Sequence, residues 1–257
     1  MADLLPALAP LPEDDDVALR LVPVGPAQEL AAQFAGVARA LSAEQTVDKT
    51  LARLVDVAVD IIPGCHHAGV TVVRRGRPET PAATDEVPAA VDALQYETGQ
   101  GPCLSAIREH AVYRTGELAA DERWPAFAEA AARTGVRSVL AFRLFTDEDT
   151  LGALNLYSRD RDAFDDETVP IGTILAAHAA LAFDRARDRE QISGLEHALN
   201  SNRRIAMAIG MLMANHRIKE NEAFNLLRMA SQRSNRRLRD IADEVVRTGG
   251  LRARPTP

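Results

Sequence analysis

Apolar side chains recur at three- and four-residue steps in two stretches near the start of the chain, and this spacing predicts two amphipathic helices. The first stripe consists of Leu30, Phe34, Val37 and Leu41. The second begins at Leu51 and stops at Ile62, directly before Pro63–Gly64, a pair that ends helices. Each stripe covers one side of its helix, so we expect both helices to pack on a further element.

Short runs in which apolar and polar residues alternate come next, and they predict strands separated by helices. In 138–145 the alternation places Leu140, Phe142 and Leu144 on one face, and 151–158 is expected to be the hairpin neighbour. The other predicted elements are strands at 67–73, 78–84 and 112–114 and helices at 87–96, 103–110 and 124–133. Together they indicate an α+β domain with a mainly antiparallel sheet flanked by helices.

A heptad pattern extends over about 30 residues beyond this domain. Its positions are Ile171, Ile174, His178, Leu181, Arg185, Asp188, Ile192, Leu195, Leu199 and Asn202. We expect a connector helix over 171–200 that lies on its own sheet as far as Leu181. Beyond that point we expect it to pair with its twin as a coiled coil in a homodimer. The polar layer at Arg185 and Asp188 lowers coiled-coil stability, so a change of register would cost little free energy.

Three short helical patterns occupy the last fifth of the chain. Their stripes are Ile205, Ala208 or Ile209, Leu212 and His216; then Ala223, Phe224, Leu227 and Ala230; then Leu238, Ile241, Ala242 and Val245. None is wide enough to be buried alone, which predicts an all-α three-helix module. Ser234 or Asn235 is expected to cap the third helix, because a short polar side chain accepts from the free N–H groups of a first turn.

Charge is divided unevenly between the two parts of the chain. From Ser201 onward, twelve Lys and Arg residues stand against five Asp and Glu, while the whole chain carries a net charge of −7. The first 200 residues therefore hold 18 basic residues against 32 acidic ones. An acidic body with a basic C-terminal module is typical of a nucleic-acid-binding protein, although a solvated helical surface also explains a run of charge.

These patterns divide the chain into a flexible leader at 1–26, the α+β domain at 27–170, the connector at 171–200, the helical module at 195–248 and a flexible tail at 249–257. The leader lacks the basic start and clean apolar core of a signal peptide. No apolar run approaches the roughly 18 residues of a membrane span. Two cysteines, Cys65 and Cys103, do not make a disulfide framework. We therefore expect a cytoplasmic protein without membrane association.

Short motifs follow one another through the C-terminal module in a fixed order. They are Leu195, Ala198, Leu199, Arg203–Ile205, Ala208–Met213, Glu222–Phe224, Leu227–Arg228, Ser231 and Asn235–Ala242. The series resembles the ANTAR domain, the three-helix RNA-binding module of bacterial transcription antiterminators. The chain departs from that pattern at Ile209, where many members carry a basic residue, so an RNA contact made there in relatives does not carry over.

A second set of motifs lies in the α+β domain: Gly99–Cys103, Asp121–Pro125, Val136–Leu140, Leu151–Ser158 and Ala163–Phe164. They resemble a GAF domain of the actinobacterial type found fused to ANTAR, over about residues 27–190. The resemblance implies a sensor with a small-molecule cavity on one face of the sheet. It identifies neither the ligand nor a cofactor, because a fold does not define a function.

Few residues of the chain are candidates for catalysis or metal binding. Cys103 follows a Gly-rich loop at a predicted helix start, where the dipole would lower the thiol pKa and suit a redox or ligand role; the alternative is a small packed residue. Cys65–His66–His67 has metal-ligand types, but neighbours on one turn cannot all reach one ion. No nucleophile with its base and no carboxylate pair stands out. We predict a binding module with no catalytic or metal site.

The ANTAR resemblance implies binding of paired RNA stem-loops near a terminator, so that polymerase reads through. Arginine cations neutralise stem phosphates, and their planes stack on loop bases. By position we expect RNA contacts from Arg203, Arg204, Arg228, Ser231, Arg236 and Arg237. Ala208 and Gly210 would allow either a close approach of RNA or tight helix packing. Phe224 belongs to an apolar stripe, so we expect no base stacking on aromatic rings.

Two alternatives stay open at this point. A basic last helix could belong to a ligand-responsive DNA-binding regulator of the helix-turn-helix type, although the arginines spread over two helices. The C-terminal helices could instead bind only a protein partner. For the ANTAR interpretation we expect occupancy of the sensor cavity to bias the connector helix pair, and with it the spacing of the two ANTAR modules.

Overall fold

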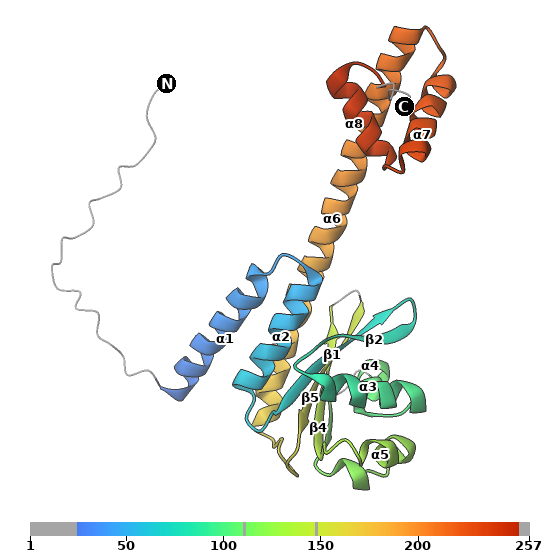
Figure 1. Cartoon of the computed structure of the whole chain (residues 1–257). Coiled ribbons are helices and arrows are strands. Elements are labelled where there is room, and N and C mark those ends of the chain that lie inside the picture. The colour runs from blue at the N-terminus through green and yellow to red at the C-terminus, as the bar shows by residue number, and fades with distance from the viewer. Residues whose placement is uncertain (1–24, 110–111, 147–148, 252–257) are drawn as a thin grey trace, which may run out of the picture.

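Figure 1 shows a computed structural model in which one long helix joins two bodies. The structure describes residues 25–109, 112–146 and 149–251. Most of the predicted leader and the end of the predicted tail lie outside these residues. Within the described part of the chain, no helix combines the length and the apolar character that crossing a membrane requires.

The larger body is built on a five-stranded sheet in the order β2–β1–β5–β4–β3, and every neighbouring pair is antiparallel. The strands are β1 (His67–Arg74), β2 (Arg77–Ala83), β3 (Tyr113–Thr115), β4 (Ser138–Phe145) and β5 (Thr150–Ser158). The central strand, β5, is buried from Leu151 to its end, because helices cover both faces of the sheet. The predicted α+β class with a mainly antiparallel sheet is confirmed.

One face of the sheet is covered by α2 (Val47–Ile61) and the first part of α6 (Thr168–His216), and α1 (Pro26–Ala43) packs on the outer side of these two helices (Figure 1). The residues of α6 buried here are Gly172, Leu175, Ala176, Ala179, Ala180, Ala182, Phe183 and Ala186. Most are small, which lets the helix lie close to the strands. At Gly172 any Cβ would collide with the ring of Phe142, so only glycine fits.

The opposite face is covered by α3 (Glu86–Thr98), α4 (Pro102–Glu109), a short 3₁₀ turn η1 (Leu118–Ala120) and α5 (Pro125–Ala131). A second, smaller apolar core lies here, around Phe127 and Trp124. Gly99 ends α3 with φ +67°, and Gly101, with φ +134°, lies so close to Gln95 that a Cβ would collide with it. The Gly-rich loop therefore serves a tight packing of α4 against α3.

The connector and the first helix of the C-terminal body are one uninterrupted helix, α6, of 49 residues. At 1.5 Å per residue it is about 74 Å long. The helix lies on its sheet as expected and stays there as far as Ala186, but two of the heptad residues in this part, Ile174 and Leu181, do not face the sheet. Ile174 is 40% exposed and Leu181 53%, because the small residues between them make the contact.

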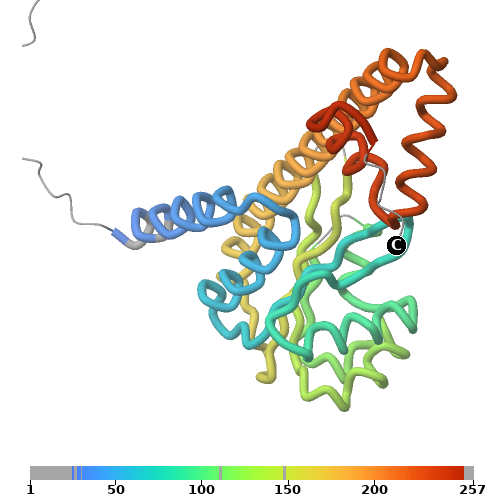
Figure 2. The backbone as a smooth tube through the Cα atoms, turned by 45° about the horizontal axis from the view of Figure 1, so that its top comes forward, coloured from blue at the N-terminus to red at the C-terminus, as the bar shows by residue number. Residues whose placement is uncertain are grey.

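The C-terminal body consists of the end of α6, α7 (Glu220–Ser234) and α8 (Leu238–Thr248), which Figure 2 shows gathered at one end of the molecule. Its buried core is Ala208, Leu212, Ala223, Leu227, Ile241, Ala242 and Val245. This arrangement confirms the predicted three-helix module, and all but one of the predicted stripe residues of α7 and α8 are at least partly buried. The exception is Phe224, which is 40% exposed.

The predicted cap of the third helix is wrong. Arg237 is the N-cap of α8, and it makes no side-chain capping bond. Asn235 instead ends α7 in the left-handed conformation, with φ 50°, which asparagine tolerates better than most residues. The hydroxyl of Ser234 donates to the carbonyl oxygen of Ala230 at 2.7 Å, one turn back in α7.

Candidate functional site

Two arginines predicted to contact RNA lie where α6 passes the start of α8. Arg203 and Arg204 line a pocket of about 750 Å³ together with His197, Asn200, Ser201, Met207, Arg239, Asp240 and Asp243. Arg204 Nε lies 2.6 Å from Asp243 Oδ1. Arg203 is exposed and pairs with no acid among the described residues. The sequence did not single out Arg239 or His197, which share this pocket.

A second group of predicted residues surrounds the α7–α8 turn. Arg236 Nη1 lies 2.6 Å from Glu244 Oε2, and the hydroxyl of Ser231 donates to the carbonyl oxygen of Arg236, also at 2.6 Å. These bonds fix the shape of the turn, so Ser231 has a structural role that the sequence did not indicate. Arg237 is exposed beside them, and Arg228 is exposed on α7.

Ion pairs with nearby carboxylates determine how much of each arginine's charge is available to bind a phosphate. Arg203, Arg228 and Arg237 are exposed and take part in none of the ion pairs of the described chain, so their charge is free for a phosphate. Arg204 and Arg236 are paired, but their side chains are 43% and 47% exposed. Exposed ion pairs contribute about 0–1 kcal/mol, so a phosphate can compete with the carboxylate.

The two small residues singled out in α6 have different environments. Ala208 is fully buried among the three helices, so packing explains its size. Gly210 is exposed, and no atom lies within 4 Å of a Cβ added there. Packing therefore does not account for Gly210, and its surface is open to the close approach of another molecule.

A network of polar side chains fills the space between the sheet and α3. At its centre the fully buried carboxylate of Asp92 accepts from the hydroxyl of Tyr157, from Asn155 Nδ2 at 3.1 Å, from Gln95 Nε2 at 3.0 Å and from Thr80 Oγ1 at 2.9 Å. Burial raises the pKa of Asp92 to about 6, because the loss of water outweighs the four donors.

A chain of hydroxyl groups continues from the carboxylate. Thr80 Oγ1 lies 2.7 Å from the Tyr96 hydroxyl, which lies 2.9 Å from Thr71 Oγ1, and Thr71 Oγ1 lies 3.0 Å from Cys103 Sγ. Each group can donate in either direction, so the chain can adapt to an ionised or a neutral Asp92. Asn155 Oδ1, also buried, has no partner among the described atoms.

The sequence missed this network, although α3 shows a trace of it. Asp92, Gln95 and Tyr96 recur at three- and four-residue steps on a helix that has apolar residues on its other side. The partners Asn155 and Tyr157 are 63 and 65 residues away from Asp92, so only the folded sheet reveals the assembly.

Cys103 is fully buried in this network rather than presented at an open helix end. Burial raises the pKa of its thiol well above the ordinary value, and the charge of Asp92 adds to the effect. The expected lowering by the helix dipole is therefore wrong, because desolvation outweighs it. The structure favours the alternative of a small packed residue.

The ligand-type residues near β1 point to separate partners. His66 Nδ1 lies 2.9 Å from Ser158 Oγ, His67 Nδ1 lies 2.5 Å from Asp85 Oδ2, and burial raises the pKa of Cys65 to about 12. Among the described residues, no group of three or more His, Cys, Asp or Glu side chains could hold a metal ion.

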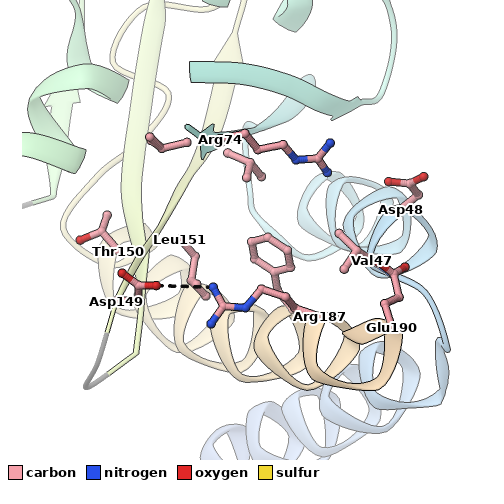
Figure 3. Close-up of a pocket in the computed structure, with 11 residues that line it drawn as sticks. Val47, Asp48, Arg74, Asp149, Thr150, Leu151, Arg187 and Glu190 are labelled. Carbon is pink, nitrogen blue, oxygen red and sulfur yellow. Dashed lines mark hydrogen bonds and ion pairs between the residues drawn. The ribbon is translucent and has the colours of Figure 1, made fainter. Parts of the chain in front are cut away.

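A pocket of about 640 Å³ lies where α6 leaves the sheet (Figure 3). The buried side chains of Val72, Leu151 and Phe183 lie in its lining. Charged side chains from α2, β1, α6 and the end of the β4–β5 turn complete that lining: Asp48, Arg74, Asp149, Arg187 and Glu190. Figure 3 shows the ion pair between Arg187 and Asp149, 3.5 Å apart, on one side of this space.

Two successive residues of α6 hold the turn between α1 and α2. Arg189 Nη1 donates to the carbonyl oxygen of Glu44, at the end of α1, at 2.8 Å. Glu190 Oε1 accepts from the N–H of Val47, at the start of α2, at 2.9 Å. A cation at a helix C-terminus and an anion at an N-terminus both complement the helix dipole. From 191 to 200 every residue of α6 is exposed.

In this fold an α+β domain with a buried polar centre is joined by a single helix to a basic three-helix module. The chain belongs to the GAF domain family, whose model matches residues 44–184, and residues 193–246 match the ANTAR domain. Both resemblances are thereby confirmed. GAF domains are sensor domains, and ANTAR domains are RNA-binding modules of antitermination.

Solved structures share the GAF fold. The GAF domain of a phosphoenolpyruvate-protein phosphotransferase from Coxiella burnetii matches with a TM-score of 0.52 and 13% identity, over 65% of this chain and 99% of that one. A GAF sensor protein from Burkholderia vietnamiensis gives 0.51 and 15%, over 63% and 98%. The free methionine-R-sulfoxide reductase from Neisseria meningitidis gives 0.48 and 17%, over 62% and 93%.

Identities this low show the fold alone, and the likeness to the reductase carries no argument about activity. No curated protein matches the chain.

Proposed function

We propose that this protein is a transcription antiterminator that binds RNA stem-loops in nascent transcripts through its ANTAR domain, under the control of a signal sensed by its GAF domain. The observation that carries the proposal is a set of exposed arginines, Arg203, Arg228 and Arg237, that form no ion pair with any described residue. They lie on a small bundle with twelve basic residues against five acidic ones from Ser201 onward. Such cations neutralise the phosphates of a folded RNA.

The placement of the arginines favours RNA over duplex DNA. A helix-turn-helix protein reads the major groove with one recognition helix. Here Arg203 lies on α6, Arg228 on α7 and Arg237 at the start of α8, so the charge is spread over three elements. A distributed basic surface suits the irregular shape of a stem with its loop.

An apolar line along α6 supports a homodimer. Ile174, Leu181, Ile192, Leu195 and Leu199 are 40%, 53%, 56%, 58% and 69% exposed. They lie in one heptad frame, and exposed apolar residues at that spacing pair with a second helix of the same kind. A parallel pairing would place two ANTAR domains side by side, as a pair of stem-loops requires.

We propose that α6 transmits the signal, because it belongs to both bodies without a break. A ligand or another change in the GAF domain would alter how α6 is held at Arg189 and Glu190, and thereby the pairing of the two copies. The burial of Cys103 favours a small-molecule signal over a redox signal. In this proposal the protein is a cytoplasmic regulator and not an enzyme.

Gel shifts test the proposal. The full-length protein is titrated with a tandem stem-loop RNA, with its single-stranded scrambled sequence and with duplex DNA. We expect the tandem stem-loop to bind at the lowest protein concentration. Preference for duplex DNA would favour a DNA-binding regulator. Absence of binding to all three nucleic acids would favour a protein partner for the C-terminal helices.

A further inference from the structure

Phe224 does not belong to the core of the ANTAR domain. Its predicted stripe neighbours Ala223 and Leu227 are fully buried, whereas the side chain of Phe224 is 40% exposed. The reason is geometric: each residue of a helix is turned by about 100° from the one before it. Since Ala223 points into the bundle, Phe224 points to the side of it, which leaves the ring partly exposed.

The residues around Phe224 form a continuous line on the surface of α7. Asn221, Phe224, Arg228 and Ser231 follow at steps of three, four and three, so they share one side of the helix. Two of them, Arg228 and Ser231, were singled out by the sequence as RNA contacts. Phe224 therefore extends a candidate RNA-binding line toward the start of α7.

A pocket gives this ring a defined setting. Phe224 lines a space of about 510 Å³ with Ile209 of α6 and with Lys219, Glu220 and Asn221 at the start of α7. The space is shallow and open to solvent, so a flat ring can reach it from outside the protein. An apolar floor of Ile209 and Phe224 beside a cationic and an amide side chain suits a flat, polar-edged ring.

The chemistry of the pocket matches a nucleobase better than a phosphate. An aromatic ring offers a face on which any base can stack. The Asn221 Oδ1 accepts from the N–H of Glu222 at 2.9 Å, which leaves the two N–H groups of the amide to meet the edge of a base. Glu220 would repel a phosphate placed in the pocket. Lys219, which also lines it, and Arg228, one turn beyond Phe224 on α7, can neutralise the adjoining RNA backbone.

We propose that Phe224 is a stacking platform for one unpaired base of the RNA loop. This inference rests on the proposed function and specifies the part of the RNA that the module reads, namely a flipped-out loop base in addition to the stem phosphates. It also replaces the expectation that aromatic rings take no part in binding.

The first experiment compares Phe224→Leu and Phe224→Trp in the full-length protein, by fluorescence anisotropy with an end-labelled stem-loop. We expect Phe224→Leu to weaken binding about tenfold, because loss of one stacked base has an effect of that order, and Phe224→Trp to bind as the wild type does. The salt dependence of Phe224→Leu stays that of the wild type, since the ring carries no charge. Met229→Ala is the matched control, because Met229 is 39% exposed on α7 outside the line.

The second experiment varies the RNA. Abasic substitutions are placed one at a time through the loop. At one loop position, the abasic substitution should weaken binding by the wild type about as much as Phe224→Leu weakens binding to intact RNA. The wild type and Phe224→Leu should bind this abasic RNA with equal affinity. Equal binding of wild type and Phe224→Leu to intact RNA would overturn the inference, as would a loss that no abasic position reproduces.

Failure of the proposed RNA binding and failure of the stacking proposal give different results. If the wild type binds no stem-loop, the proposed function itself fails. If Phe224→Leu weakens binding while sedimentation shows a change in the number of chains per particle, Phe224 is a contact between proteins and the stacking proposal is overturned. Thermal melting of both variants checks the fold, which should be unchanged because the ring lies outside the core.

Discussion

The carboxylate of Glu190 on α6 accepts a hydrogen bond from the backbone N–H of Val47 at 2.9 Å, across 143 residues of sequence. The bond supplies a side-chain acceptor at the start of α2, where backbone N–H groups lack helical partners. With Arg189 on the end of α1, it marks the last place where α6 is tied to the GAF domain before its exposed stretch.

Glu190→Ala, which removes the acceptor, should therefore loosen the junction without changing the core. We expect a decrease of about 1 kcal/mol in the free energy of unfolding, the usual effect of losing a helix N-terminal cap. Hydrogen exchange should become faster at the start of α2. Glu196→Ala is the control, because Glu196 lies on the exposed part of α6. Identical exchange in both variants would contradict a role for this bond at the junction.

The row of exposed apolar residues on α6 predicts that a single charged substitution dissociates the homodimer. Leu199→Glu should convert a two-chain particle into a single chain, because a carboxylate replaces an apolar residue in the predicted seam. The isolated chain should keep its fold, since Leu199 is 69% exposed within it. Sedimentation equilibrium measures the change. Asn200→Glu, one position on, is the control, and dissociation of both variants alike would argue against a specific seam.

Asp92 predicts a pH dependence of stability. Its pKa is raised from 3.8 to about 6, so the folded protein keeps this proton to a higher pH than the unfolded chain does. The contribution of Asp92 to the free energy of unfolding is therefore complete below about pH 4 and is lost as the pH rises through about 6. A shift of about two units corresponds to about 3 kcal/mol.

Urea unfolding between pH 4 and 8 tests this contribution. Asp92→Asn keeps the shape of the neutral carboxyl group and can donate to Thr80 from Nδ2. Relative to this variant, the wild type should lose stability as the pH rises across the window. Parallel profiles of the two proteins would show that Asp92 does not titrate in this range.

The arginines at the α7–α8 turn predict two different phenotypes. Arg237→Ala should weaken stem-loop binding and reduce the slope of affinity against salt by about one, because it removes one exposed cation. Arg236→Ala should in addition destabilise the turn, since Arg236 pairs with Glu244. Titrations at several salt concentrations separate the effects. A salt slope equal to that of the wild type would remove Arg237 from the interface.

Periodicity predicted the elements well where one face of each is buried. The strand over 138–145 has the same bounds in the structure, because Leu140, Phe142 and Leu144 face one core. The heptad line was found for the same reason, although the pattern could not tell which side of α6 the sheet would occupy. Small residues such as Gly172 determine which side of α6 lies on the sheet. Gly172 does so through a contact with Phe142, which no local sequence pattern reveals.

The candidate sites were harder to predict, because they depend on distant contacts or on the rotation of a helix. The hydroxyl chain from Asp92 to Cys103 joins four elements, so the sequence suggested a reactive thiol where the fold buries one. Periodicity assigned Phe224 to the core, because an apolar stripe does not show which of its residues lie at the boundary of the buried face. An offset of one residue from Ala223 was enough to bring the ring to the surface.

The unbroken course of α6 has a mechanical consequence. From Glu190 to His216 the helix extends about 39 Å, so a tilt of about 5° at the junction would move its far end by roughly 3 Å. A displacement of that size equals the length of a hydrogen bond. Because the helix works as a lever, a rearrangement too small to alter the GAF domain's packing can still bring arginines into register with an RNA backbone or take them out of it.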